Sequence, residues 1–162
     1  MQSRALSDQL ATVVNTVSLV KKNPFPQFVN SLVVRLADAF INGSNDLRAV
    51  IARVLGQMGS ELLLVFSCNE VARRIIVVSH SNDPIARAHT LTALASIAGI
   101  AKENKEVHHI VIESLSSKHK EEFKAACAAL GAYCSLSTDF TSTVMAQLSD
   151  YLLSSTSPIE RK

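Results

Sequence analysis

The sequence contains no tryptophan, and aromatic residues make up only 5% of its 162 residues. Proline and glycine are also scarce, with four and five residues. Tight turns between strands rely on these two residue types, so their scarcity argues against a strand-rich fold. The chain is 48% hydrophobic, and with so few rings its core must be built from Leu, Val, Ile and Ala. We therefore expect long helices.

Strong charge is missing as well, because the net charge is only +2. A net charge this small indicates neither nucleic acid nor a membrane surface as a partner. The three cysteines are an odd number, which argues against a disulfide framework and favours a reducing compartment. No apolar run approaches the ~20 residues that a membrane helix needs, and the first residues lack a signal-peptide core. These features leave the cytosol or the nucleus.

Motifs for chemistry are absent too. His108 and His109 are adjacent, so on a helix they point ~100° apart and make poor joint metal ligands. We expect one of them to face the core and the other to face solvent. Cys127 and Cys134 lie on one face of a helix, and we expect both to be buried. No Gly-rich phosphate loop and no catalytic triad can be recognised, so no cofactor, metal or small-molecule substrate is expected.

Basic residues occur only in short clusters, at Lys21-Lys22, Arg73-Arg74 and Lys118-His119-Lys120. Each cluster falls near a predicted helix end, where cations complement the helix dipole. None is interleaved with aromatic residues, so direct binding of nucleic acid is not expected.

Apolar residues recur at helical spacing along almost the whole chain. The pattern predicts about eight helices, at residues 3–22, 26–41, 45–59, 69–79, 83–102, 107–115, 121–136 and 138–153. The run LLLVF at 62–66 would suit a strand, but a single strand has no partner, so we expect a short helix or a buried turn. Phe25, between two prolines, is expected to fill the joint between the first two helices. Short joints force consecutive helices to lie antiparallel.

Two of these helices share a sequence pattern. Aligning "SNDLRAVIARVLGQMG" (44–59) with "DPIARAHTLTALASIA" (83–98) matches Arg48 with Arg87, at a separation of 39 residues. A weaker unit at 121–135 places Lys124 37 residues after Arg87. A period near this length with two helices per unit is typical of HEAT and armadillo arrays. The sequence therefore predicts an all-α fold, an α-solenoid of stacked antiparallel helix pairs. Residues 1–162 would form one repeat region, either a single domain or a piece of a longer array.

The repeated turn predicts a ladder of polar contacts between neighbouring units. Asp83 can cap its helix, and Pro84 occupies the first helical position, where its missing N–H costs nothing. We expect Arg87 to pair with Asp46 or Asp83 across units, because a guanidinium group matches a carboxylate. The alternative is that Arg87 is a solvated surface charge. The predicted ladder residues are Asp46, Arg48, Asp83, Pro84 and Arg87.

The order of several motifs resembles one known family. "NPFPQFVNSLVVRLADAFINGSNDLR" (23–48) has a Pro-Phe-Pro joint, Leu-Ala-Asp at 36–38 and an Asn-Asp-Leu-Arg turn at 45–48. "VVSHSNDPIARAHTLTALASIAGI" (77–100) has His-Ser-Asn-Asp-Pro-x-Ala-Arg-Ala at 80–88. Both segments resemble the N-terminal region of the Integrator complex subunit 7 family. Residues 125–140 are similar to it more loosely, and the paired histidines also match.

Members of this family are far longer, so the resemblance implies that residues 1–162 are the amino-terminal part of a longer solenoid. It also implies a nuclear location, with or without a cytoplasmic pool, and a place among other Integrator subunits. The Integrator processes the 3′ ends of small nuclear RNAs and terminates transcription by RNA polymerase II, which this subunit would contact only indirectly. Its endonuclease and phosphatase lie in other subunits, so the resemblance implies a non-catalytic helical scaffold. The family is also linked to the DNA-damage response.

Two other hypotheses remain open from the residues themselves. The repeat pattern fits equally a HEAT-repeat module of another assembly, such as a transport adaptor or a phosphatase scaffold. An enzyme with an unrecognised helical site would need a pocket with convergent polar groups.

Overall fold

The computed structural model describes the backbone of residues 2–155 and the side chains of residues 7–150. Within that range the chain forms nine α-helices and two short 3₁₀ helices, and no strand. The elements are α1 (Gln2–Lys22), α2 (Pro26–Asn42), α3 (Asn45–Met58), η1 (Gly59–Leu64), α4 (Cys68–Ile76), η2 (Val77–His80), α5 (Pro84–Ser96), α6 (Ala98–Ala101), α7 (Lys105–Ser114), α8 (Lys120–Cys134) and α9 (Thr138–Ser155). The all-α prediction is confirmed.

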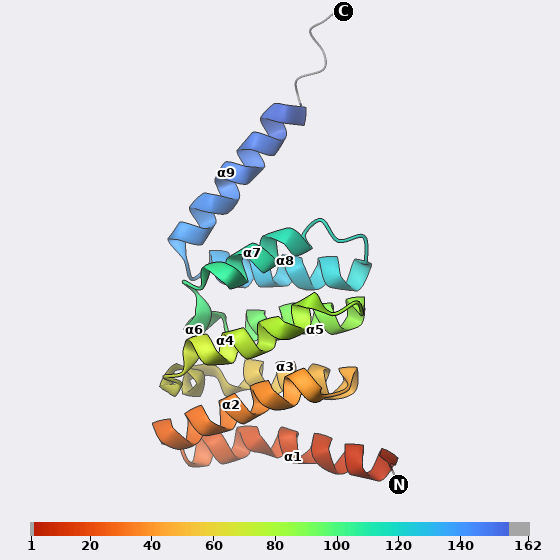
Figure 1. The fold of residues 1–162 in the computed structure, drawn as a ribbon. Coiled ribbons are helices and arrows are strands. Elements are labelled where there is room, and N and C mark those ends of the chain that lie inside the picture. Colours follow the sequence, from red (N-terminus) through yellow and green to blue (C-terminus); the bar gives the residue numbers. More distant parts are fainter. Residues whose placement is uncertain (1, 156–162) are drawn as a thin grey trace, which may run out of the picture.

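The helices stack as successive pairs (Figure 1). Helices α1, α3, α5 and α8 pack one upon the next and form a first layer. Helices α2 and α4 pack on each other in the second layer, α6 contacts α4, α5 and α8, and α7 packs on α8. Helix α9 packs on α8 and then extends away from the stack (Figure 1). This arrangement confirms the predicted helical-repeat architecture.

Helix starts follow from capping residues and proline. Pro26 and Pro84 occupy the first turns of α2 and α5. The side chain of Asp83 accepts a hydrogen bond from the Ile85 N–H at 2.9 Å, so its predicted role as a cap is confirmed. Helix α3 is capped by Ser44, whose hydroxyl accepts a hydrogen bond from the Leu47 N–H.

Two predicted helices are shorter than their apolar patterns suggested. The helix predicted at 83–102 is interrupted at Ile97, whose backbone (φ −95°, ψ 10°) leaves the helical region and starts the short α6. The helix predicted at 69–79 ends at Ile76 and continues as the 3₁₀ helix η2. The ambiguous segment 62–66 begins inside η1, which confirms a short helix there in place of a strand. Gly59 starts η1 with a φ of 58°, a conformation that favours glycine.

The core lies between the two layers and is mainly aliphatic, as the composition predicted. Leu55, Leu94, Ile51 and Ile75 are almost completely buried. A small ring cluster adds to it where α7, α8 and α9 meet. His108 lies edge-on to Tyr133, with ring centroids 5.7 Å apart, and 4.3 Å from the ring of Phe140.

The two histidines divide as expected. His108 is 6% exposed, and its Nε2 donates to the Lys102 carbonyl oxygen at 2.6 Å. The side chain of His109 is 79% exposed.

Two predictions about single side chains were wrong. Phe25 does not fill the joint, because 64% of it is exposed. Cys127 is also exposed, and Cys134 is only half-buried. The buried face of α8 runs through Glu122, Ala126, Ala129 and Tyr133, and Cys127 lies one position off that stripe.

Candidate functional site: contacts between repeats and surface pockets

Arg87 connects two neighbouring helices of the first layer. From the first turn of α5, its Nε and Nη2 donate to the two carboxylate oxygens of Glu122 on α8, each at 2.8 Å. Its Nη1 donates to the carbonyl oxygen of Ser81, in the joint before α5, at 2.7 Å. Ser117 also donates to Glu122, at 2.8 Å. The Glu122 side chain is only 7% exposed, so this two-point ion pair is largely removed from water.

The partner of Arg87 is therefore not the one predicted. Neither Asp46 nor Asp83 forms an ion pair with Arg87, and the alternative of a solvated Arg87 is also wrong, because its side chain is 22% exposed and engaged. Glu122 was missed because the predicted partners precede Arg87 in the chain, whereas Glu122 lies 35 residues after it, in the following unit. The only signal in the sequence was the acidic first turn of the helix that begins at Lys120, in line with the repeat.

Arg48, the repeat equivalent of Arg87, is held in a related way. Its Nε and Nη2 donate to the carbonyl oxygens of Phe40 and Ile41 at the end of α2, each at 3.0 Å. Its Nη1 donates to the side-chain oxygen of Asn45 at 3.0 Å. The amide nitrogen of Asn45 in turn donates to the Asp83 carboxylate of the next unit at 2.6 Å. Arg87 on α5 therefore binds the carboxylate of Glu122 on α8 directly. Arg48 on α3 instead binds Asn45, and Asn45 binds the Asp83 carboxylate at the start of α5.

The five predicted residues thus have different roles. Arg48, Asp83 and Arg87 take part in contacts to neighbouring elements or units. Pro84 is the first residue of α5 and has only the local role predicted for it. Asp46 lies exposed in the first turn of α3 and makes no side-chain hydrogen bond to any described residue.

The charges in these contacts are stabilised in their ionised forms. The hydrogen bond from Arg87 lowers the pKa of Glu122, and Ser117 adds to the effect. The same pair raises the pKa of Arg87. The pKa of Asp83 is lowered by the Asn45 amide first and by the Ile85 N–H second. Each carboxylate therefore binds its proton less readily in the folded chain than in the unfolded chain.

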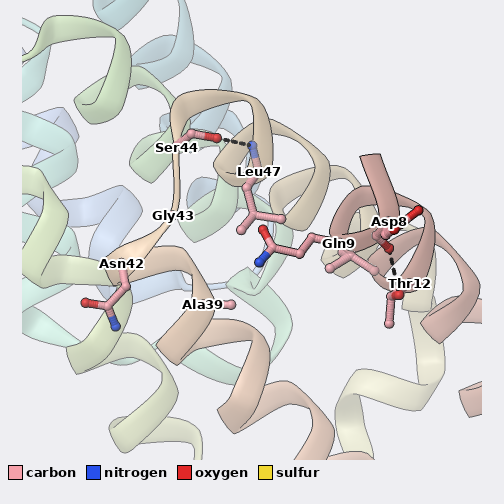
Figure 2. A pocket seen from close by; sticks show the side chains of 9 residues that line it. Asp8, Gln9, Thr12, Ala39, Asn42, Gly43, Ser44 and Leu47 are labelled. Carbon is pink, nitrogen blue, oxygen red and sulfur yellow. Dashed lines mark hydrogen bonds between the residues drawn. The ribbon is translucent and has the colours of Figure 1, made fainter. Parts of the chain in front are cut away.

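A pocket of about 640 Å³ lies between α1 and the joint that connects α2 to α3. Figure 2 shows Gln9 extending from α1 toward Leu47, with Ala39 nearby on α2. Gln9 lies 39 residues before Arg48, so at this first interface a neutral amide occupies the position at which the next two units have Arg48 and Arg87. The exposed surface of the lining is mostly apolar, and its polar side chains are those of Asp8, Gln9, Thr12, Asn42 and Ser44.

A second, more polar pocket of about 310 Å³ surrounds the Arg87–Glu122 pair. Ser79 lines it, and its hydroxyl is buried without a hydrogen-bond partner among the described residues. Arg87 and Glu122 in its wall are paired with each other, and Glu113 also lines the pocket. Among the described side chains no group of three or more His, Cys, Asp or Glu residues is placed to hold a metal ion. None of the described helices is long and apolar enough to cross a membrane.

Paired helices, repeated polar turns and stacked layers define a helical-repeat protein of the α-solenoid class. The comparison with protein families shows which family of helical-repeat proteins this is. Residues 1–162 match the family described as Integrator complex subunit 7, N-terminal, and the chain belongs to that family.

Individual relatives agree with this assignment. Integrator complex subunit 7 of Homo sapiens is 36% identical over 162 residues, which is 100% of this chain and 17% of that protein. The protein of the same name from Gallus gallus is 35% identical over the same length and share. The Integrator complex subunit 7 homolog of Dictyostelium discoideum is 30% identical over 148 residues, 91% of this chain and 14% of that protein. The chain thus spans about a sixth of the length of these relatives, and the family resemblance noted in the sequence is confirmed.

Proposed function

We propose that this chain is a non-catalytic scaffold region of an Integrator complex, in the nucleus, which holds other Integrator subunits in place. Through them it would support 3′-end processing of small nuclear RNAs and termination of transcription by RNA polymerase II. Any contact with the polymerase machinery would be indirect. The observation that supports this proposal best is the family match over all of residues 1–162.

The geometry is in keeping with a scaffold. Its charged groups in the repeat contacts, such as Arg87 and Glu122, are used to hold one unit on the next. Stacked helix pairs present an extended surface whose common use is binding other proteins. The larger of the two pockets described above has an apolar lining, and the polar one contains an internally neutralised ion pair.

We further propose that residues 1–162 form one repeat region within a longer solenoid. This proposal is supported by the family description, which names the N-terminal part of Integrator complex subunit 7, and by the length of the human relative, of which the chain covers 17%. Each described unit packs its apolar stripe against a neighbour, and such arrays extend by adding units.

Affinity purification from nuclear extract tests the proposal. The chain would be expressed with a tag beside a tagged helical-repeat protein of similar size from outside the Integrator, and the bound proteins would be identified by mass spectrometry. We expect several other Integrator subunits to be enriched with this chain and not with the control. Recovery of a transport adaptor coat or a phosphatase core without any Integrator subunit would overturn the assignment.

A further inference from the structure

Large apolar side chains are exposed at one edge of the stack. Phe25 is 64% exposed, Phe66 is 66% exposed and Leu63 is 66% exposed. Aromatic rings are few in this chain, and two of them stand in solvent here instead of in the core. Clustered exposed apolar side chains on a soluble domain mark sites of protein contact more often than isolated ones do.

These residues belong to the same edge of the fold. Phe25 lies in the joint from α1 to α2. Phe66 lies in the joint from η1 to α4, three residues after Leu63, which is in η1. Both joints are on the side of the stack where first-layer helices end and second-layer helices begin (Figure 1). Helix α2 packs against η1, so the two joints are neighbours.

The side chain of Asn30 fixes the second joint to α2. Its Oδ1 accepts from the N–H groups of Phe66 at 3.1 Å and Ser67 at 2.9 Å, and its Nδ2 donates to the Ser67 hydroxyl at 3.2 Å. Asn30 itself is 8% exposed, so these bonds are sheltered from water. Asn30 lies five residues after Phe25, a rise of about 7.5 Å along the axis of α2. Asn30 therefore holds the second joint near the start of α2, where the first joint ends.

Both aromatic residues have a restrained backbone. Phe25 lies between Pro24 and Pro26, and its N–H donates to the Asn23 carbonyl oxygen at 2.8 Å. A residue before proline is confined to extended conformations, and Phe25 has φ −89° and ψ 126°. Phe66 is held by Asn30. A ring on a fixed backbone loses little freedom when a partner covers it, which is the property of a binding hot spot.

The charge beside Phe25 is positive. Lys21 and Lys22 are both exposed in the last turn of α1, directly before this joint. No described carboxylate forms an ion pair with either lysine. The neighbouring element η1 contains one acidic residue, Glu61, and it forms no ion pair with these lysines. A partner that covers Phe25 therefore reaches a joint that follows two exposed cations in the chain.

We propose that Phe25, Leu63 and Phe66, which we term the joint-edge patch, together with Lys21 and Lys22, form a docking surface for an acidic, apolar segment of a partner protein. Apolar side chains of that segment cover the two rings, and its carboxylates face the lysine pair. This inference takes one point from the proposed scaffold role, namely that the molecule bound at this surface is a protein. It does not depend on the Integrator assignment, so the peptide experiment below and the purification above can fail separately.

Fluorescence anisotropy with three labelled peptides tests the surface. The probes are a short peptide that alternates Leu and Phe with Asp, and two counterparts in which every Asp is replaced by Asn or by Lys. We expect saturable binding of the acidic peptide, weaker binding of the neutral one and weakest binding of the basic one. Phe25→Ala and Phe66→Ala should each weaken the acidic peptide about tenfold. Lys21→Glu combined with Lys22→Glu should reverse the preference between acidic and basic peptides.

Phe123→Ala is the matched control, because Phe123 is 46% exposed but lies on α8, away from this edge. It should leave the affinity unchanged. Thermal melts of each variant show whether the fold is kept. The proposal is overturned if the acidic peptide does not bind, if Phe25→Ala and Phe66→Ala behave like Phe123→Ala, or if the peptides bind equally whatever their charge.

Discussion

Arg87 on α5 and Glu122 on α8 form a two-point ion pair between consecutive units, with both N–O distances at 2.8 Å. The planar guanidinium group matches the carboxylate, and Ser117 satisfies a further lone pair of Glu122. Because Glu122 is nearly buried, the pair fixes how α8 sits on α5. Loss of either member would leave the other ionised and poorly solvated.

Replacing Arg87 by alanine should lower the free energy of unfolding by about 1–3 kcal/mol, because Glu122 and the Ser81 carbonyl lose their donors. Arg87→Lys should recover only part of this loss, since lysine cannot donate two bonds in one plane. Urea denaturation measures both. Arg73→Ala is the control, because Arg73 is 66% exposed in its pair with Glu70, and its loss should have little effect. Equal stabilities for Arg87→Ala and Arg73→Ala would contradict this account of the pair.

Acid should weaken the fold in part through Glu122. Its folded pKa lies below the ordinary value of 4.5, so the unfolded chain binds the proton more readily. The stabilisation is therefore fully present above pH 4.5 and is lost as the pH falls through the lower folded pKa. Urea midpoints measured against pH should separate the original chain from Glu122→Gln at neutral pH and converge in acid. A constant gap between the two curves down to the lowest pH would show that ionisation of Glu122 does not matter.

Much of the architecture could be predicted because it depends on local patterns. Helical spacing, scarce glycine and proline, and the repeated turn at Arg48 and Arg87 predicted stacked helix pairs. The cap at Asp83 was also predicted, since capping needs only nearby backbone N–H groups. The contacts of Arg87 were different in kind. The repeat period predicts where the helix of Arg87 lies in the stack. It does not predict which carboxylate of the next unit lies opposite Arg87, because that depends on how far α8 is shifted along α5.

The failures concern the directions in which side chains point. The prolines beside Phe25 predicted a rigid joint, but they do not determine whether the ring turns inward. Cys127 and Cys134 share a helical face in sequence, yet the buried stripe of α8 is rotated away from Cys127. The interruption at Ile97 had only Gly99 as a signal, because the apolar pattern continues on both sides. Tertiary packing decided each of these cases.

Leu94→Ala should destabilise the chain by about 2–5 kcal/mol, because Leu94 is completely buried between layers and alanine would leave a cavity. The matched substitution Leu63→Ala removes the same atoms from a side chain that is 66% exposed, and it should cost far less. Thermal and urea unfolding of the pair provide the comparison. Similar losses for the two variants would mean that Leu94 does not contribute to the core as described.

Asn30→Ala should loosen the joint that carries Phe66. The N–H groups of Phe66 and Ser67 would lose their acceptor, at a cost of about 1–3 kcal/mol. Hydrogen exchange followed by mass spectrometry should show faster exchange at residues 66 and 67, while the amides inside α5 change only with the global stability. Exchange at the joint that stays as slow as in the original chain would rule out Asn30 as its anchor.

The scaffold role is tested most directly by a chimera of the human relative. Residues 1–162 would replace the matching region of Homo sapiens Integrator complex subunit 7, to which they are 36% identical, in cells depleted of the natural subunit. We predict that the chimera co-purifies with the other Integrator subunits at levels close to those of the human protein. A chimera that is stable and nuclear but recovers none of them would contradict the proposed function.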